Sequence, residues 1–233
     1  MRPSEELAEL KEQGLMRVLR PLPAGGGKFE QGGRTILNFS SNDYLNLAND
    51  PRLKEAAISA IQRLGCGATA SRLMSGHLEL HEQLEAALAR LTGREAALVF
   101  GSGFLTNLGV VTTLAGRGDA IFADRLSHAS LVDGARLAGA RLRRFRHGDA
   151  DHLEQLLIQE TGARRRVVVT DSVFSMDGDR APLAEIAAAA RRHGALLVVD
   201  EAHAIGVLGE RGGGLCAALP EPLRPVVVVG TLS

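Results

Sequence analysis

The sequence predicts an α/β fold in which a mostly parallel β-sheet carries helices on both faces. From residue 77 onward, short apolar runs rich in β-branched residues alternate with longer segments that have apolar residues at helical spacing. Most of the short runs are almost wholly apolar, which is typical of strands buried on both faces, and repeated strand–helix alternation favours parallel pairing.

The first 65 residues are less regular and come before this alternation. Apolar residues at helical spacing predict a helix over 4–20, which the prolines and glycines of 21–27 interrupt. A strand over 35–39 and a polar turn over 40–43 follow, and a helix over 51–64 begins at Pro51 after the possible cap Asp50. We expect residues 1–45 to form an N-terminal segment and residues 46–233 to form the main domain.

The main domain has an ordered set of expected elements. Helices are expected over 77–92, 103–115, 128–138, 149–161 and 182–193. Strands are expected over 96–100, 120–123, 141–145, 166–171, 195–200 and 226–229. The last strand leads directly into Gly230-Thr231-Leu232-Ser233, and domains seldom stop on a buried strand, so we expect the sequence to be part of a longer protein.

Composition excludes several classes of protein. The chain has 233 residues, of which 27 are basic and 27 acidic, and a net charge of zero argues against a general nucleic-acid binder. No apolar run approaches the roughly 20 residues of a membrane span, and the start lacks the apolar segment of a signal peptide. The two cysteines form no disulfide or metal pattern. We therefore expect a cytoplasmic protein without nucleic-acid or membrane partners.

The most informative stretch is 195–203, in which an apolar strand ends at Asp200 and His203 follows three residues later. A helicase strand can end in this way, but no phosphate loop of the nucleotide-binding type is present. The glycine spacing after residue 100 does not fit a dinucleotide site, because Thr106 stands where the third glycine belongs. A hydrolase triad would need a nucleophile elbow that is also absent.

Pyridoxal 5′-phosphate (PLP) fits the strand ends better. Gly101-Ser102-Gly103-Phe104 follows an expected strand and opens a helix, where free N–H groups and the helix dipole can hold a phosphate. His128 begins another helix at the same edge and could stack on the ring. Asp200 could keep the ring nitrogen protonated, and His203 could reach the ring hydroxyl.

Ordinary structural roles remain open for each of these residues taken alone. Gly103 could be part of a plain glycine-rich turn, and His128 or Asp200 could cap a helix. His77 and His81 have a metal-compatible spacing but no third ligand in view, so partly exposed structural histidines are the preferred interpretation. The lysine that PLP enzymes require is missing, because Lys11, Lys28 and Lys54 all precede the alternating region.

Several stretches together resemble the α-oxoamine synthases, which are PLP-dependent enzymes of fold type I. They are residues 38–45, 102–104, 124–130, 173–179 and 199–203. The terminal 230–233 is similar to the segment just before the Schiff-base lysine of that family. The resemblance implies an aspartate-aminotransferase-like large domain without its C-terminal small domain, and no catalysis by these residues alone.

The resemblance also implies roles for individual residues. Backbone N–H groups of Gly103 and Phe104 would hold the phosphate, and Thr231 would add a phosphate contact across a dimer interface. The catalytic residues would be four in number: His128 stacked on the ring, Asp200 at its nitrogen, and Ser175 and His203 at the ring hydroxyl and the reacting thioester carbonyl. The substrate-binding residues implied are Arg17 and Asn42, for the substrate carboxylate or acyl chain, and His77, at a hinge near the partner's active site.

Residues 40–45 and 174–183 are most similar to the family member that condenses L-alanine with pimeloyl-CoA or pimeloyl-carrier protein in biotin biosynthesis, as a homodimer. Members that join glycine or another amino acid to a different acyl-CoA stay open. A non-catalytic domain that binds PLP or a protein partner is the alternative of another class.

Overall fold

The computed structural model describes residues 2–19, 21–22 and 27–232. It divides into two compact units, Met1–Gly65 and Cys66–Ser233. The expected division at residue 45 stays a prediction. Parts of the expected helix, of its interruption and of the terminal motif lie outside the described residues, namely Arg20, residues 23–26 and Ser233.

The first unit contains two helices and a hairpin, which are α1 (Pro3–Glu12), β1 (Lys28–Gln31), β2 (Arg34–Leu37) and α2 (Pro51–Leu64). The expected helix over 4–20 is wrong in its second half. Gly14 has φ 68° and the N–H of Leu15 donates to the Leu10 carbonyl at 2.8 Å, which is the way helices end at a left-handed glycine. Arg17 therefore lies outside the helix.

The sequence predicts one strand of the hairpin, over 35–39, which corresponds to β2, and does not predict β1. Gly32 and Gly33 both have positive φ, 59° and 73°, and a two-residue hairpin turn with two positive φ angles favours glycine at both positions. The start of α2 was predicted correctly, because Asp50 accepts the Arg52 N–H at 2.8 Å and Pro51 occupies the first turn.

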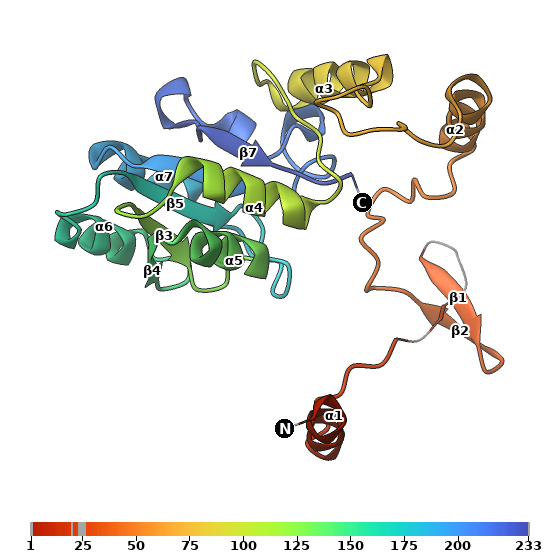
Figure 1. Cartoon of the computed structure of the whole chain (residues 1–233), viewed down its shortest axis with the longest axis horizontal. Helices are drawn as coiled ribbons and strands as arrows, with labels where there is room; N and C mark the ends of the chain where they lie inside the picture. The colour runs from red at the N-terminus through yellow and green to blue at the C-terminus, as the bar shows by residue number, and fades with distance from the viewer. Residues whose placement is uncertain (1, 20, 23–26, 233) are drawn as a thin grey trace. The chain divides into compact units, whose positions relative to one another are not determined.

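The second unit is built on a five-stranded parallel sheet, as expected (Figure 1). The strand order is β4-β3-β5-β6-β7. The strands are β3 (Ala120–Asp124), β4 (Arg141–Phe145), β5 (Arg166–Asp171), β6 (Leu196–Asp200) and β7 (Val227–Val229). Helix α3 (Glu79–Thr92) precedes them, and three short 3-10 turns, Glu210–Gly212, Cys216–Ala218 and Glu221–Leu223, lie between β6 and β7.

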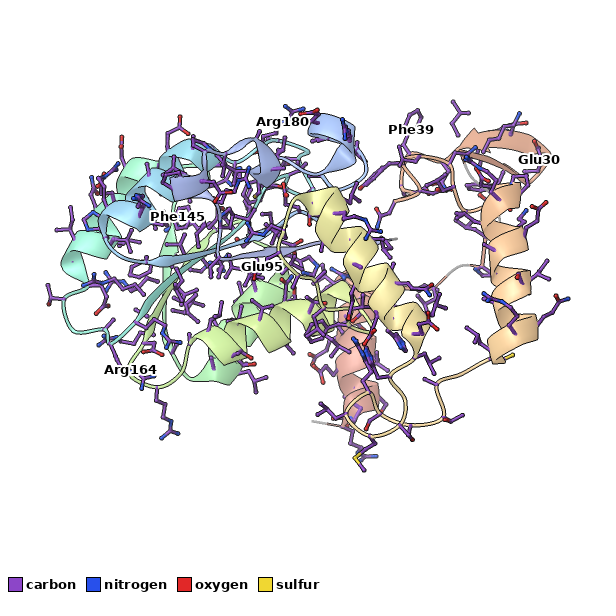
Figure 2. The ribbon with its side chains drawn as sticks, turned by 90° about the horizontal axis from the view of Figure 1, so that it is seen from above. Glu30, Phe39, Glu95, Phe145, Arg164 and Arg180 are labelled. Carbon is purple, nitrogen blue, oxygen red and sulfur yellow. The ribbon has the colours of Figure 1, made fainter. Side chains whose placement is uncertain are left out.

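Helices cover both faces of this sheet, which confirms the fold class. Alternate strand residues point to opposite faces, so the strands contribute to two separate cores. One core joins Ile121, Val169 and Val198 to α4 (Gly103–Leu114) and α5 (Ala129–Ala138). The other joins Phe122, Val168 and Val199 to α6 (Ala150–Gln159) and α7 (Leu183–Arg192). Phe145 lies fully buried in this second core (Figure 2).

The expected strand over 96–100 is wrong, because no strand of the described chain pairs with it. Side chains bind its backbone instead. The Val99 N–H donates to Glu85 Oε1 at 2.8 Å, and its carbonyl accepts from Arg72 Nη1 at 2.9 Å. The apolar composition predicted burial of this segment in a sheet, but strand formation also requires a neighbouring strand.

The strand order contains a reversal at β3. β3 pairs with β4 on one side and with β5 on the other, while α5 and α6 lie on opposite faces. Ligands of open α/β sheets bind outside the carboxyl ends of the strands at such a reversal. None of the described helices is long and apolar enough to cross a lipid bilayer.

Candidate active site

Parallel pairing gathers the predicted residues of the second unit at the carboxyl edge of the sheet. His128 follows β3, Ser175 follows β5, and Asp200 ends β6 and is followed by His203. Thr231 comes two residues after β7. Their assembly at one edge follows from the topology, and their chemical roles stay predictions.

The start of α4 forms one end of this group. Ser102 caps the helix by accepting the Leu105 N–H at 3.2 Å, so the backbone N–H groups of the first turn begin at Gly103 and Phe104. A Cβ atom on Gly103 would lie 2.6 Å from Thr231 Cγ2, so this close approach requires glycine. Thr231 thus lies beside Gly103 of its own chain, and its phosphate contact across a dimer interface stays a prediction.

Asp200 is held in a fixed orientation. Its side chain is buried, Oδ1 accepts the Ala202 N–H at 2.9 Å, and Oδ2 accepts from Asn107 Nδ2 at 2.7 Å. Both carboxylate oxygens therefore have a donor, which is the state in which a buried acid can remain an anion.

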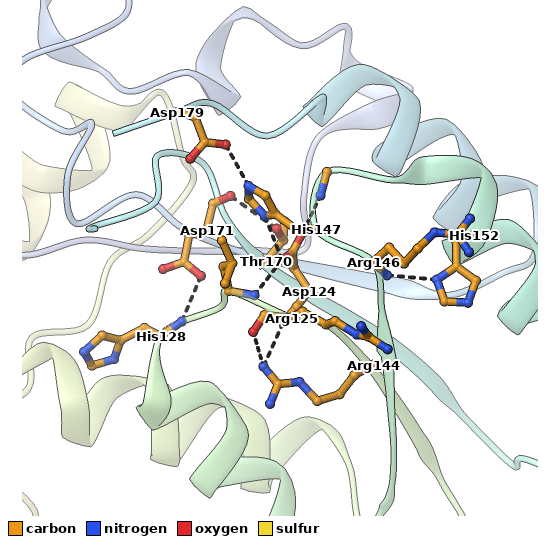
Figure 3. Close-up of polar contacts among 12 residues, drawn as sticks. Asp124, Arg125, His128, Arg144, Arg146, His147, His152, Thr170, Asp171 and Asp179 are labelled. Atoms are coloured by element: carbon orange, nitrogen blue, oxygen red, sulfur yellow. Dashed lines mark hydrogen bonds and ion pairs between the residues drawn. The ribbon is translucent and has the colours of Figure 1, made fainter. Parts of the chain in front are cut away.

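His128 occupies the N-cap of α5 with an exposed ring. Its Nδ1 lies 2.7 Å from Ser130 Oγ and 3.3 Å from the Ser130 nitrogen. Its own backbone N–H donates to Asp171 Oδ2 at 3.1 Å (Figure 3). Backbone and ring are thus both fixed by hydrogen bonds, and one ring face can meet a ligand.

Asp171 is a site residue that the sequence did not identify. It ends β5 directly opposite Asp200 on β6. Burial and the nearby charge of Asp200 raise the pKa of Asp171 to about 7, although the His128 N–H opposes the shift. The edge therefore holds a carboxyl group that changes charge near neutral pH.

The loop that carries Ser175 is attached to β3 by His147. The ring of His147 lies between Asp124 Oδ1 at 3.0 Å and Asp179 Oδ2 at 2.9 Å (Figure 3), and it forms a T-shaped pair with the ring of Phe174. Burial opposes protonation, but hydrogen bonds to the two carboxylates outweigh it and raise the pKa of His147. Ser175 is exposed on this loop, and His203 is half-buried on the turn after β6.

The three predicted substrate residues do not follow strands of the sheet. Arg17 and Asn42 are exposed residues of the first compact unit, and their substrate contacts stay predictions. His77 precedes α3, where its Nδ1 accepts from Arg72 Nε at 3.1 Å and its ring stacks on His81. In the described residues no group of three or more acidic, histidine or cysteine side chains could hold a metal ion.

Sequence reasoning missed Asn107 and Ser130, which contact Asp200 and His128. Asn107 stands one helical turn after Gly103 in a helix that is otherwise mostly apolar, and this spacing was the available signal. Asp171 could have been found from its place at the end of a strand beside β6.

Comparison with known proteins agrees with this geometry. The family described as Aminotransferase class I and II matches residues 34–233. The chain belongs to this family, and the resemblance to α-oxoamine synthases within it is confirmed.

Among curated relatives, the 8-amino-7-oxononanoate synthases of Alkalilimnicola ehrlichii and Anaeromyxobacter sp. strain Fw109-5 are 54% and 55% identical over 98% and 97% of this chain. The chain spans 59% and 57% of their lengths. The serine palmitoyltransferase of Sphingomonas wittichii superposes with a TM-score of 0.87 at 35% identity, covering 98% of this chain and 58% of that one.

Proposed function

We propose that these residues form the PLP-binding part of an 8-amino-7-oxononanoate synthase, a cytoplasmic homodimer that condenses L-alanine with pimeloyl-CoA or pimeloyl-carrier protein and releases CO₂. One observation carries the proposal. Sequences 54–55% identical over nearly the whole chain are such synthases, and this chain gathers an anion cradle, an imidazole and a buried carboxylate at one sheet edge.

The residues at the edge fit PLP. The N–H groups of Gly103 and Phe104 and the hydroxyl of Thr231 would hold its phosphate, where a Cβ on Gly103 would fill the space. Asp200, with its two oxygens fixed by donors, would hold a proton on the ring nitrogen. When bound, PLP supplies an electron sink for the electron pair left at the amino-acid Cα.

The remaining residues would act on the substrates. His128 would cover one ring face and exclude water from it, while Ser175 and His203 would orient the ring hydroxyl and the acyl carbonyl. Arg17 and Asn42 would contact the substrate carboxylate or acyl chain, and His77 would lie at a hinge near the partner's active site. The second unit contains no lysine, since Lys11, Lys28 and Lys54 all belong to the first.

A ligand that needs no lysine tests this proposal directly. N-(5′-phosphopyridoxyl)-L-alanine, titrated calorimetrically into the chain, should bind, and the glycine analogue should bind more weakly. Gly103→Ala and Asp200→Asn should each weaken binding by about ten-fold or more, because the added Cβ would crowd the phosphate position and the amide would remove the charge that meets the ring nitrogen. Gly194→Ala is the matched control, since Gly194 has no heavy atom within 4 Å of an added Cβ. Absence of binding by the unaltered chain would contradict the proposal, and preference for the glycine analogue would favour another synthase of the family.

A further inference from the structure

A continuous line of hydrogen bonds joins Asp200 to His128 through two side chains that have no assigned role. Asn107 Nδ2 donates to Asp200 Oδ2 at 2.7 Å and to Ser130 Oγ at 2.9 Å. Ser130 Oγ in turn lies 2.7 Å from His128 Nδ1. The four residues come from α4, α5, its N-cap and β6, so the line connects elements that are distant in sequence.

The direction of every proton in this line is determined. A carboxylate only accepts hydrogen bonds, so the amide NH₂ of Asn107 must face Asp200, and its second proton points at Ser130 Oγ. Ser130 is then free to donate its hydroxyl proton to His128 Nδ1, which also faces the Ser130 N–H. Nδ1 is therefore an acceptor, and the neutral ring of His128 carries its proton on Nε2.

Burying these polar side chains would lower the stability of the fold if they served only to fill space. Asn107 is 1% exposed, Ser130 0% and Asp200 6%. The Oδ1 atom of Asn107 has no hydrogen-bond partner within the described part of the chain. A buried acceptor without a partner lowers stability, and an apolar side chain of the same size would avoid that cost. The amide of Asn107 is explained by the hydrogen bonds that its NH₂ group donates to Asp200 and Ser130.

We infer that Asn107 is a positioning residue that sets the Asp200 carboxylate and, through Ser130, the tautomer and ring orientation of His128. The inference rests on the proposed function, in which these two side chains meet the nitrogen and one face of the PLP ring. Since Gly103 lies one turn earlier on α4, a single helix then positions the groups for the phosphate, the ring nitrogen and the ring face.

Two measurements test this inference on the whole chain. The first is the ¹⁵N spectrum of His128 in ligand-free protein in alkaline buffer, which reports which ring nitrogen carries the proton. The second is the affinity for pyridoxamine 5′-phosphate, with the ¹⁵N shift of its ring nitrogen when bound. The variants are Asn107→Leu, Ser130→Ala, and the exchange Asn107→Asp with Asp200→Asn. Thr112→Val is the control. It removes a partly buried hydroxyl from the same helix, and the hydrogen bonds of this hydroxyl go to carbonyls of α4.

We expect Thr112→Val to match the unaltered chain in both measurements. Asn107→Leu and Ser130→Ala should replace the single Nε2–H tautomer of His128 by a mixture, and Asn107→Leu should weaken pyridoxamine phosphate binding about ten-fold. The exchange restores an amide–carboxylate pair and so should restore the melting temperature. It should nevertheless leave binding weak and the ring nitrogen less protonated, because the carboxylate has moved to position 107.

Three results would overturn the inference. They are an unchanged His128 tautomer in both single variants, full affinity in the exchange variant, or equal effects from Thr112→Val. If Asn107→Leu does not fold, Ser130→Ala and the exchange still decide the matter. Failure of the unaltered chain to bind pyridoxamine phosphate would reject the proposed function, whereas the ligand-free tautomer would still show whether Asn107 controls His128.

Discussion

At the scale of single residues, Asp171 is the group whose charge depends most directly on pH near neutrality. Its pKa is about 7, against an ordinary 3.8, so the folded state keeps a proton that the unfolded chain releases. Between these values the unfolded state binds fewer protons than the folded state. Stability therefore falls as pH rises from 3.8 to about 7 and stays lower above it.

Asp171→Asn should remove this part of the pH dependence. An amide oxygen can still accept the His128 N–H, and repulsion from Asp200 disappears. We expect the variant to be more stable than the unaltered chain above pH 7, by on the order of 1 kcal/mol or more. Urea unfolding across a pH series measures this. Identical pH profiles for the two proteins would contradict it.

At the scale of elements, segment 96–100 depends on side chains for its backbone hydrogen bonds. Arg72 and Glu85 form an ion pair of 2.7 Å, and the hydrogen bond to Arg72 holds the pKa of Glu85 below its ordinary value. Glu85→Ala removes the acceptor of the Val99 N–H. Hydrogen exchange at Val99 should accelerate about ten- to hundred-fold, as expected for loss of a charge-assisted hydrogen bond. Glu82→Ala, on the exposed side of the same helix, should leave that amide unchanged.

The loop between β6 and β7 is held by Glu201. This buried carboxylate accepts the N–H groups of Leu215 at 2.6 Å and Cys216 at 3.2 Å, and burial raises its pKa. Gly214 has φ 87°, and a Cβ there would lie 2.2 Å from Glu201 Oε2.

Gly214→Ala should therefore cost more stability than a change of backbone preference alone. We expect roughly 3–5 kcal/mol, from the left-handed backbone together with displaced hydrogen bonds. Gly194 also has a positive φ, 62°, but a Cβ there would have no atom within 4 Å. Gly194→Ala should therefore lower the free energy of unfolding by only about 1–2 kcal/mol. Chemical denaturation of both variants compares them, and equal losses would show that the contact with Glu201 does not matter.

At the scale of the whole molecule, the proposed ligand would add contacts between elements that already meet at the carboxyl edge of the sheet. Its contacts would come from the start of α4, the N-cap of α5 and the ends of β5, β6 and β7. Pyridoxamine 5′-phosphate at a hundredfold excess over its dissociation constant should stabilise the fold by about 2.7 kcal/mol. Hydrogen exchange should slow at these strand ends and not in α1 or the β1–β2 hairpin. Protection confined to the first 65 residues would place the ligand elsewhere.

The architecture was predictable from the sequence because it depends on local patterns. Apolar β-branched runs gave β3, β5 and β6 within one residue, and the Asp50–Pro51 pair gave the start of α2. Strand polarity then placed His128 and Asp200 at one edge. The family itself was recognisable from motifs at strand ends, since those positions contact ligands in such sheets.

Other features depend on residues that are far apart in sequence. Segment 96–100 has the apolar composition of a strand, but the backbone hydrogen bonds of its Val99 are made with the side chains of Arg72 and Glu85. Gly14 shortened the first helix through a backbone angle that a periodicity argument does not include.

The sequence by itself determined the fold class, the order of the elements and the edge at which the site forms, because each follows from local periodicity and from strand direction. Only the tertiary structure decided that Thr231 packs on Gly103 of its own chain, that Asp171 faces Asp200, and that Asn107 joins Asp200 to Ser130. The physical reason is that a buried polar side chain must find its partner in three dimensions, and the partner of Asn107 lies 93 positions away along the chain.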